Sequence, residues 1–226
     1  MIRLYDYILS ADCYKVRLFC ALLGVTYTPV KVNVHPGHEH LSPEFSRINP
    51  RQSIPVLEDG EHRVCDTNAI LLHLARRHDP IGRWLPKDDV AFDHVMEWLG
   101  FAAKELDLLQ TLRMRSITAG GEPSPQELEM AHARLTIIED HLAEGELTGR
   151  PWLAGHASTI ADIAVFPRFL RQAMQAPLLP NESCQGGGGI QNGFFRLPTR
   201  PDSRLAQRGA TEELTKGQAR TVSPVP

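Results

Sequence analysis

Ser53-Ile54-Pro55-Val56-Leu57 and, shortly after it, Asp66-Thr67-Asn68-Ala69-Ile70 are the two segments that decide the fold and the site. The first predicts a strand entered through an X-Pro bond, which can be cis at modest cost and then turns the preceding amide outward. The second predicts a helix start, whose free N–H groups and positive dipole end favour a carboxylate. Together they indicate a site for a small peptide-like ligand with a free carboxylate.

The composition excludes several classes of protein. The chain has 226 residues and a formal net charge of −3, so we expect neither a nucleic-acid partner nor a membrane-binding face. Met1-Ile2-Arg3-Leu4-Tyr5 leads directly into a predicted strand, without the basic segment and long apolar run of an export signal. We therefore expect a cytoplasmic protein.

The cysteines are spaced without a CxxC or a zinc pattern. They are Cys13, Cys20, Cys65 and Cys184. This usage suits a reducing compartment better than a disulfide framework. We expect no metal site and no permanently bound cofactor.

Residues 1–80 alternate strand and helix signals, which favours an α/β domain. The expected elements are a strand at 2–6, a helix that Gly24 closes, strands at 27–34, 54–58 and 62–65, and a helix that ends near His78. The apolar residues of these helices recur at helical spacing. Trp84-Leu85-Pro86 marks the expected domain boundary.

Residues 88–175 show helical spacing only and are predicted to form an all-α domain. One apolar series, from Phe92 to Leu109, predicts a single long helix. Ser124-Pro125-Gln126-Glu127 is a capping box with proline at the first helical position. Thr159 and Asp162 are expected to cap a later helix reciprocally.

Residues 176–226 differ in character, because glycine fills 186–189, prolines are frequent and no apolar periodicity is sustained. We expect an atypical, flexible tail that packs no core of its own. Such a tail is consistent with a frame-shifted or alternative C-terminus. It would leave apolar surface exposed, with poor solubility, altered oligomer contacts or lost activity as consequences.

Four motifs occur in order along the chain: Ser10 to Arg17, Asn49-Pro50 leading to Ile54-Pro55-Val56-Leu57, the helix start Asp66 to Ile70, and Thr159 to Pro167. In this order they resemble the cytosolic glutathione transferase family, in its bacterial and theta-like branch. The resemblance covers residues 1–175. It implies a thioredoxin-like N-terminal domain that binds glutathione as co-substrate, an all-helical C-terminal domain and a homodimer. It also implies that the glutathione thiolate attacks a small hydrophobic electrophile.

By this resemblance Ser10 is the catalytic residue that holds the glutathione sulfur. A free thiol with a pKa of about 8.5 is only about 3% thiolate at neutral pH, and lowering that pKa by about two units requires roughly 2.7 kcal/mol. One hydroxyl hydrogen bond to the anion contributes about 1.5 to 3 kcal/mol, and a helix N-terminus about 0.3 to 1 kcal/mol. A serine beside the helix is therefore sufficient. The plainer interpretation is that Ser10 only caps the helix.

The resemblance assigns glutathione contacts to His40, Ser53, Ile54, Pro55, Asp66 and Thr67. Asp66 and Thr67 stand where the family usually has Glu-Ser and would hold the γ-glutamyl amino and carboxylate groups. His40 matches a histidine near the glycine end of glutathione. Ser53 stands where the family often has a longer donor, and Arg51 or Gln52 could compensate.

Two other functions stay open. Cys13 could form a mixed disulfide with glutathione, which would make the protein a glutathione-dependent disulfide reductase or peroxidase that uses Cys13 or the bound glutathione. Its helical spacing to Val16 and Cys20 favours packing instead. The second alternative is a glutathione-binding scaffold that does not turn over. The electrophile is expected beside the long helix, where Leu108, Leu112 and Arg115 are unranked candidates, although the two leucines fit the core better than the site.

Overall fold

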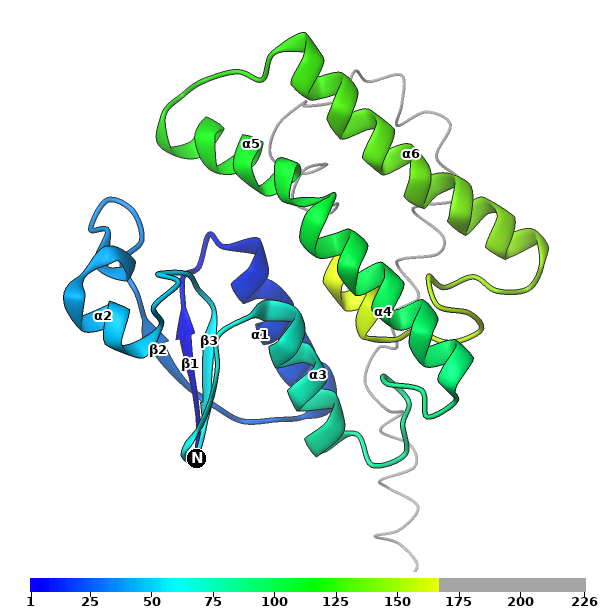
Figure 1. Ribbon diagram of the computed structural model, residues 1–226, viewed down its shortest axis with the longest axis horizontal. Helices are drawn as coiled ribbons and strands as arrows, with labels where there is room; N and C mark the ends of the chain where they lie inside the picture. Colours follow the sequence, from blue (N-terminus) through cyan, green and yellow to red (C-terminus); the bar gives the residue numbers. More distant parts are fainter. Residues whose placement is uncertain (167–226) are drawn as a thin grey trace, which may run out of the picture. The chain divides into compact units, whose positions relative to one another are not determined.

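A computed structural model of the protein describes residues 1–166 (Figure 1). An α/β layer comes first and helices follow, as expected from the sequence. The elements are β1 (Ile2–Asp6), α1 (Ala11–Leu23), β2 (Thr28–Lys31), the 3₁₀ turn η1 (Glu39–Leu41), α2 (Pro43–Ile48), β3 (Val56–Asp59), β4 (His62–Val64), α3 (Thr67–His78), α4 (Asp89–Lys104), α5 (Asp107–Thr118) and α6 (Pro125–Leu147). Residues 160–166 are also helical. The expected tail at 176–226 lies outside the described residues.

Four strands form one sheet in the order β2-β1-β3-β4. β1 and β2 are parallel, and β3 is antiparallel to both of its neighbours. Tyr5, near the end of β1, pairs with Val56 at the start of β3, and Val64 at the end of β4 pairs with Leu57. The connections that follow β1, β2 and β4 and the one that precedes β3 therefore meet at the same end of the sheet.

The two faces of the sheet carry separate cores. Leu4 and Leu57 are fully buried on the face that α1 and α3 cover (Figure 1). The neighbouring residues Tyr5 and Val56 point to the other face, as alternation along a strand requires. There they form a cluster with Phe45 of α2, and the Tyr5 and Phe45 rings meet edge to face with centroids 6.1 Å apart.

Most helices begin with the same local bond, in which the capping side chain accepts from the backbone N–H three residues on. The capping residues are Ser10, Ser42, Asp66, Asp88 and Ser124. The capping box predicted at Ser124 and Glu127 is confirmed. Gly24 ends α1 with φ of 68°, a left-handed conformation that glycine adopts without steric cost.

The structure differs from the sequence prediction in three elements. The strand expected at 27–34 is shorter, because β2 spans only Thr28–Lys31. The helix α2 was not expected. The single long helix is interrupted between Lys104 and Asp107, where Leu106 is fully buried and Glu105 pairs with Arg134 of α6 at 2.6 Å. The apolar spacing continues through this break, so periodicity alone did not reveal it.

The reciprocal cap at the start of the last described helix is confirmed. The Asp162 carboxylate accepts from the backbone N–H groups of Thr159 at 2.8 Å and Leu153 at 3.1 Å. The Thr159 hydroxyl accepts from Ala161 N at 3.2 Å. Burial raises the pKa of Asp162 to about 6, and these donors oppose that rise. The buried Asp162 carboxyl group thus connects this helix to the backbone at Thr159 and at Leu153.

Candidate functional site

The connection between β1 and α1 brings Ser10 to the end of the sheet where the connections meet. The Ser10 Oγ accepts from Cys13 N at 3.2 Å, and the Ser10 N–H donates to the Tyr7 carbonyl at 3.0 Å. The residue is only 6% exposed. A hydroxyl has one proton and two lone pairs. Capping α1 therefore uses one lone pair and leaves the Ser10 proton available to a further acceptor.

Asn49 organises the connection before β3 and is itself buried. Its Nδ2 donates to the carbonyl and the Oγ of Ser53, at 2.7 and 3.1 Å. Its Oδ1 accepts from Arg51 N at 3.0 Å. The Ile54-Pro55 bond that follows is cis, and β3 begins directly after it. One buried amide thus fixes the backbone where the peptide-like ligand was predicted.

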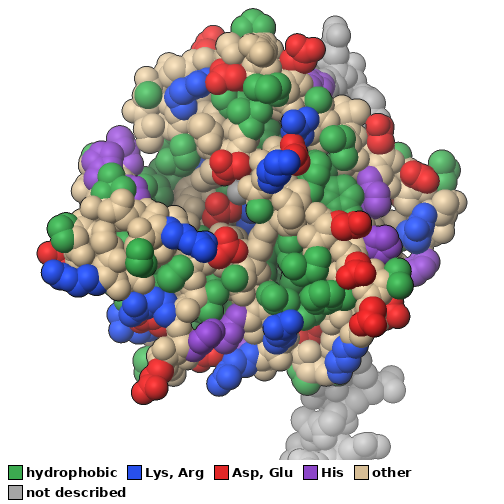
Figure 2. Space-filling model, in the orientation of Figure 1, with side chains coloured by type: hydrophobic (Ala, Val, Ile, Leu, Met, Phe, Trp, Pro, Cys, Tyr) green, Lys and Arg blue, Asp and Glu red, His purple; other side chains and the backbone are tan. Residues whose placement is uncertain are grey.

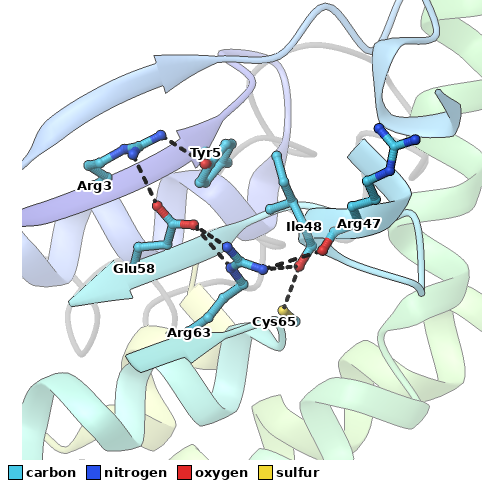
Figure 3. Close-up of polar contacts among 7 residues, drawn as sticks. All are labelled: Arg3, Tyr5, Arg47, Ile48, Glu58, Arg63 and Cys65. Carbon is cyan, nitrogen blue, oxygen red and sulfur yellow. Dashed lines mark hydrogen bonds and ion pairs between the residues drawn. The ribbon is translucent and has the colours of Figure 1, made fainter. Parts of the chain in front are cut away.

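An ion-pair network ties this connection to the sheet (Figure 3). Arg63 of β4 donates to Glu58 of β3 at 3.0 and 2.8 Å and to the Ile48 carbonyl at 3.2 Å. Ile48 ends α2, so the guanidinium lies at a helix C-terminus, where a cation is favourable. Glu58 also pairs with Arg3 of β1 at 3.5 Å, and the Cys65 thiol lies 3.9 Å from the same Ile48 carbonyl. The C-terminal end of α2, from which residues 49–53 continue, is therefore tied to β4.

The start of α3 presents Asp66 and Thr67. The Asp66 carboxylate accepts from Ala69 N at 2.9 Å and is otherwise exposed. A carboxylate has capacity beyond one cap bond, so Asp66 can still accept from an ammonium group. The free N–H groups of the first turn suit a carboxylate. Asn68, next to Thr67, donates to the Leu99 carbonyl of α4 at 2.8 Å, which fixes the orientation of this helix start.

His40 lies in η1 and is half-buried. Its Nδ1 is buried and has no hydrogen-bond partner among residues 1–166. Burial lowers the pKa of His40, and His38 lowers it further. The ring is therefore neutral at neutral pH. A contact between His40 and a ligand carboxylate would be a hydrogen bond and not an ion pair.

Cys13 is fully buried in the first turn of α1. Burial raises the pKa of the Cys13 thiol to about 12, and the neighbouring Ser10 hydroxyl opposes only part of that rise. The thiolate is the reactive form of cysteine, and it is scarcely populated here at neutral pH. Val16 and Cys20 are also fully buried, so this face of α1 is core. The redox role of Cys13 stays a prediction, with its burial against it.

The sheet topology brings the segments of all the predicted glutathione residues to one end of the sheet. Of the residues expected near the electrophile, Leu112 is fully buried and Leu108 is half-buried. Arg115 pairs with Glu127 of α6 at 2.8 Å. Sequence reasoning missed Arg113, whose Nη1 donates to the Leu9 carbonyl at 2.7 Å. No local pattern could reveal it, because 104 residues separate the two partners.

A cavity of about 410 Å³ lies on β4 and α3. It is lined by His62, Val64, Ala69, Leu72, His73, Arg76 and Arg77. The His62 and His73 rings stack with centroids 5.2 Å apart, and Asp59 pairs with His73 at 3.1 Å and Arg77 at 3.0 Å. None of the predicted glutathione residues lines it.

Within residues 1–166, no helix is both long and apolar enough to cross a membrane. In the same part of the chain, no three or more His, Cys, Asp or Glu side chains are grouped so that they could hold a metal ion.

Comparison with known proteins shows which proteins this chain is similar to. Residues 1–76 match the family model described as "Glutathione S-transferase, N-terminal domain". Mouse (Mus musculus) glutathione S-transferase theta-2 is 26% identical over 100% of this chain and 93% of its own length. A zeta-class glutathione S-transferase of Euphorbia esula is 30% identical over 71% of this chain and 67% of its own length. A solved structure of human glutathione transferase theta-2, described as a complex with glutathione and an unknown ligand, superposes with a TM-score of 0.73 at 22% identity, over 99% of this chain and 94% of that one.

The fold is that of a thioredoxin-like α/β domain followed by a helical domain. The chain belongs to the cytosolic glutathione transferase family, with theta-class relatives. The predicted fold class is thus confirmed. The bacterial branch and the exact domain limits stay predictions.

Proposed function

We propose that the protein conjugates glutathione to a small hydrophobic electrophile and that Ser10 stabilises the glutathione thiolate. The observation that carries this proposal is the position of Ser10. It caps α1 with one lone pair, keeps a proton to donate, and lies at the sheet end where the other predicted glutathione segments meet. The family of the chain and the glutathione in the solved human relative support the same co-substrate.

The chemistry needs no further cofactor. Glutathione loses its thiol proton to solvent, and the Ser10 hydroxyl and the N-terminus of α1 stabilise the sulfur anion. The sulfur lone pair then forms a bond to an electrophilic carbon. Either a leaving group departs with its bonding electrons, or the electrons move into a conjugated acceptor that takes up a proton. Because the thiolate itself is the nucleophile, a general base on the protein is not required.

Glutathione recognition is assigned to the remaining predicted residues. The backbone at Ile54, held by the Asn49 contacts with Ser53, pairs with the peptide backbone of the ligand. The exposed carboxylate of Asp66 and the first turn of α3 hold the γ-glutamyl ammonium and carboxylate groups. His40 donates a neutral hydrogen bond at the glycine end. A tripeptide with charges at both ends fits this set.

The test is a comparison of Ser10→Ala with Ser124→Ala. Both variants lose a helix N-cap, of α1 and of α6, so each should lose about 0.5 to 2 kcal/mol of unfolding free energy. Glutathione binding is measured by calorimetry, and conjugation is measured with a chlorinated nitrobenzene as the electrophile. We expect both variants to bind glutathione and only Ser10→Ala to lose conjugation.

Two results would contradict the proposal. If Ser10→Ala conjugates as fast as the wild-type protein, Ser10 is a cap and nothing more. If the folded wild-type protein binds glutathione but turns over no electrophile, the non-catalytic scaffold is the better description. Reduction of a mixed disulfide that is lost in Cys13→Ala, without conjugation, would support the redox alternative.

We also propose that two copies of the chain associate. α4 exposes the acidic residues Asp89, Asp93 and Glu97 together with Val90 and Met96, which are 64% and 41% exposed. The cavity on β4 and α3 is lined by apolar side chains together with histidine and arginine side chains. Histidine, basic, acidic and hydrophobic side chains are all exposed on the face shown in Figure 2. Such a face can bind a second copy of itself about a two-fold axis.

A further inference from the structure

Arg113 of α5 holds the peptide unit that leads into Ser10. Its Nη1 donates to the carbonyl of Leu9 at 2.7 Å. The N–H of the same peptide unit belongs to Ser10 and donates to the Tyr7 carbonyl at 3.0 Å. A peptide unit is planar, so a hydrogen bond at each end fixes the orientation of the whole unit. The Cα of Ser10, and with it the hydroxyl group, is therefore placed partly by a side chain from a distant helix.

The contact between Arg113 and the Leu9 carbonyl is made by a buried side chain. The residue is only 8% exposed, and arginine is rarely buried to this degree. A guanidinium group stays charged at every pH at which the protein is folded. By contrast, Arg17 of α1 reaches the same loop through an exposed bond of 3.3 Å to the Ile8 carbonyl and also pairs with Asp6. Arg113 makes the shorter and more buried contact, one residue nearer to Ser10.

We propose that Arg113 is a positioning residue of the thiolate site. It fixes the Leu9-Ser10 peptide so that the Ser10 hydroxyl meets the glutathione sulfur, and its buried charge favours the anionic form of that sulfur. The effect on the sulfur rests on the proposed transferase function. The effect on the peptide does not, because it concerns the protein without ligand.

The first experiment measures backbone amide exchange by NMR in the full-length protein without glutathione. Arg113→Met removes the charge and the donor, whereas Arg113→Gln is polar but too short to reach the Leu9 carbonyl. Arg134→Met is the matched control, because it removes another charge-assisted contact, to Glu105. We expect the Ser10 amide to exchange about tenfold faster or more in the Arg113 variants. Unchanged Ser10 exchange in a folded Arg113 variant would overturn the positioning role.

The second experiment follows kcat and KM for glutathione against pH. In Arg113→Met and Arg113→Gln we expect the midpoint of the kcat/KM profile to rise by about one pH unit, and kcat/KM at neutral pH to fall about tenfold. KM for glutathione should change less than kcat, because the ligand contacts on α3 and before β3 are intact. Arg113→Lys keeps the charge, and its kcat/KM profile should have the same midpoint as that of the wild-type protein. A midpoint unchanged in all three variants would exclude the electrostatic role.

The two experiments separate failure of this inference from failure of the proposed function. A folded wild-type protein that neither binds nor conjugates glutathione would refute the transferase function and the effect on the sulfur, while amide exchange still decides whether Arg113 holds the peptide. If Arg113→Met does not fold, Arg113→Gln provides both measurements. Thermal melts of all variants show whether a change in rate reflects unfolding.

Discussion

At the scale of single residues, the cysteines within residues 1–166 differ in the reactivity of their thiols because they differ in burial. Cys13 and Cys20 are fully buried, and burial raises their thiol pKa values to about 12 and about 11. Cys65 is half-buried, and its pKa is also raised by burial. Since only the thiolate reacts, we expect iodoacetamide to label Cys65 before the other two in the native protein, and faster as the pH rises.

Peptide mass spectrometry after a brief exposure measures this order. In denaturant the same three cysteines should label at similar rates, which controls for the reagent. Labelling of native Cys13 as fast as Cys65 would show that its thiolate is accessible. That result would restore the disulfide reductase or peroxidase as a competitive function.

The local contacts of the site residues could be predicted from the sequence, whereas the long-range contacts could not. The capping roles of Ser10 and Asp66 could be predicted, because each bonds a backbone N–H only three residues away. The role of Arg113 could not, because its partner is fixed only once α5 has packed. The Asn49-Pro50 motif was recognised by resemblance, but its physical cause, a buried amide that bonds Ser53, required the structure.

At the scale of elements, two helical glycines make a matched pair. Gly145 of α6 lies against residue 150, whose N–H donates to the Gly145 carbonyl at 2.6 Å, and an added Cβ would collide with the Arg150 carbonyl oxygen. Gly100 of α4 has open space around the same position. Replacing glycine by alanine in a helix gains about 0.5 to 1 kcal/mol. We expect Gly100→Ala to gain that amount and Gly145→Ala to lose stability despite the same gain in propensity.

Urea unfolding at matched protein concentration gives both free energies. Equal stabilisation by the two substitutions would mean that the turn after α6 moves away from Gly145 at no cost. A similar loss of stability in both variants would mean that helix propensity does not determine the effect of substitution in α4.

Prediction of the elements failed where a helix was short or an apolar series ran through a break. The start of α2, Ser42-Pro43-Glu44-Phe45, has the same cap and proline as the start of α6. Its local signal was therefore present, but six residues are too few to show helical periodicity. The break at Glu105 and Leu106 lacks proline or glycine and keeps the apolar spacing. Only tertiary contacts, such as the ion pair with Arg134, distinguish it.

At the scale of the whole molecule, self-association should depend on charge complementarity. Arg76 of α3 lines the cavity, and Asp93 is exposed on α4. We expect the wild-type chain to sediment as a dimer, Arg76→Glu to weaken it by about threefold to tenfold, and a second substitution, Asp93→Arg, to restore it. Added salt screens these charges and should therefore also weaken the wild-type dimer.

Analytical ultracentrifugation over a range of protein concentrations measures this equilibrium. Asp140→Arg, on α6, removes an exposed acid that belongs neither to α4 nor to the cavity lining, and serves as the charge control. A wild-type monomer at all concentrations would refute the association. A dimer indifferent to Arg76→Glu would place the interface elsewhere.

The arrangement of the sheet has a practical consequence. All the segments assigned to glutathione meet at one end, whereas the β3–β4 hairpin closes at the opposite end, where Asp59 pairs with His62. Gly60 at its tip has φ of 65° and no neighbouring atoms within reach of an added side chain. Exposed tips of this kind accept inserted peptides. A biotin-acceptor peptide grafted after Gly60 would tether the protein to a sensor chip with its binding end facing the liquid.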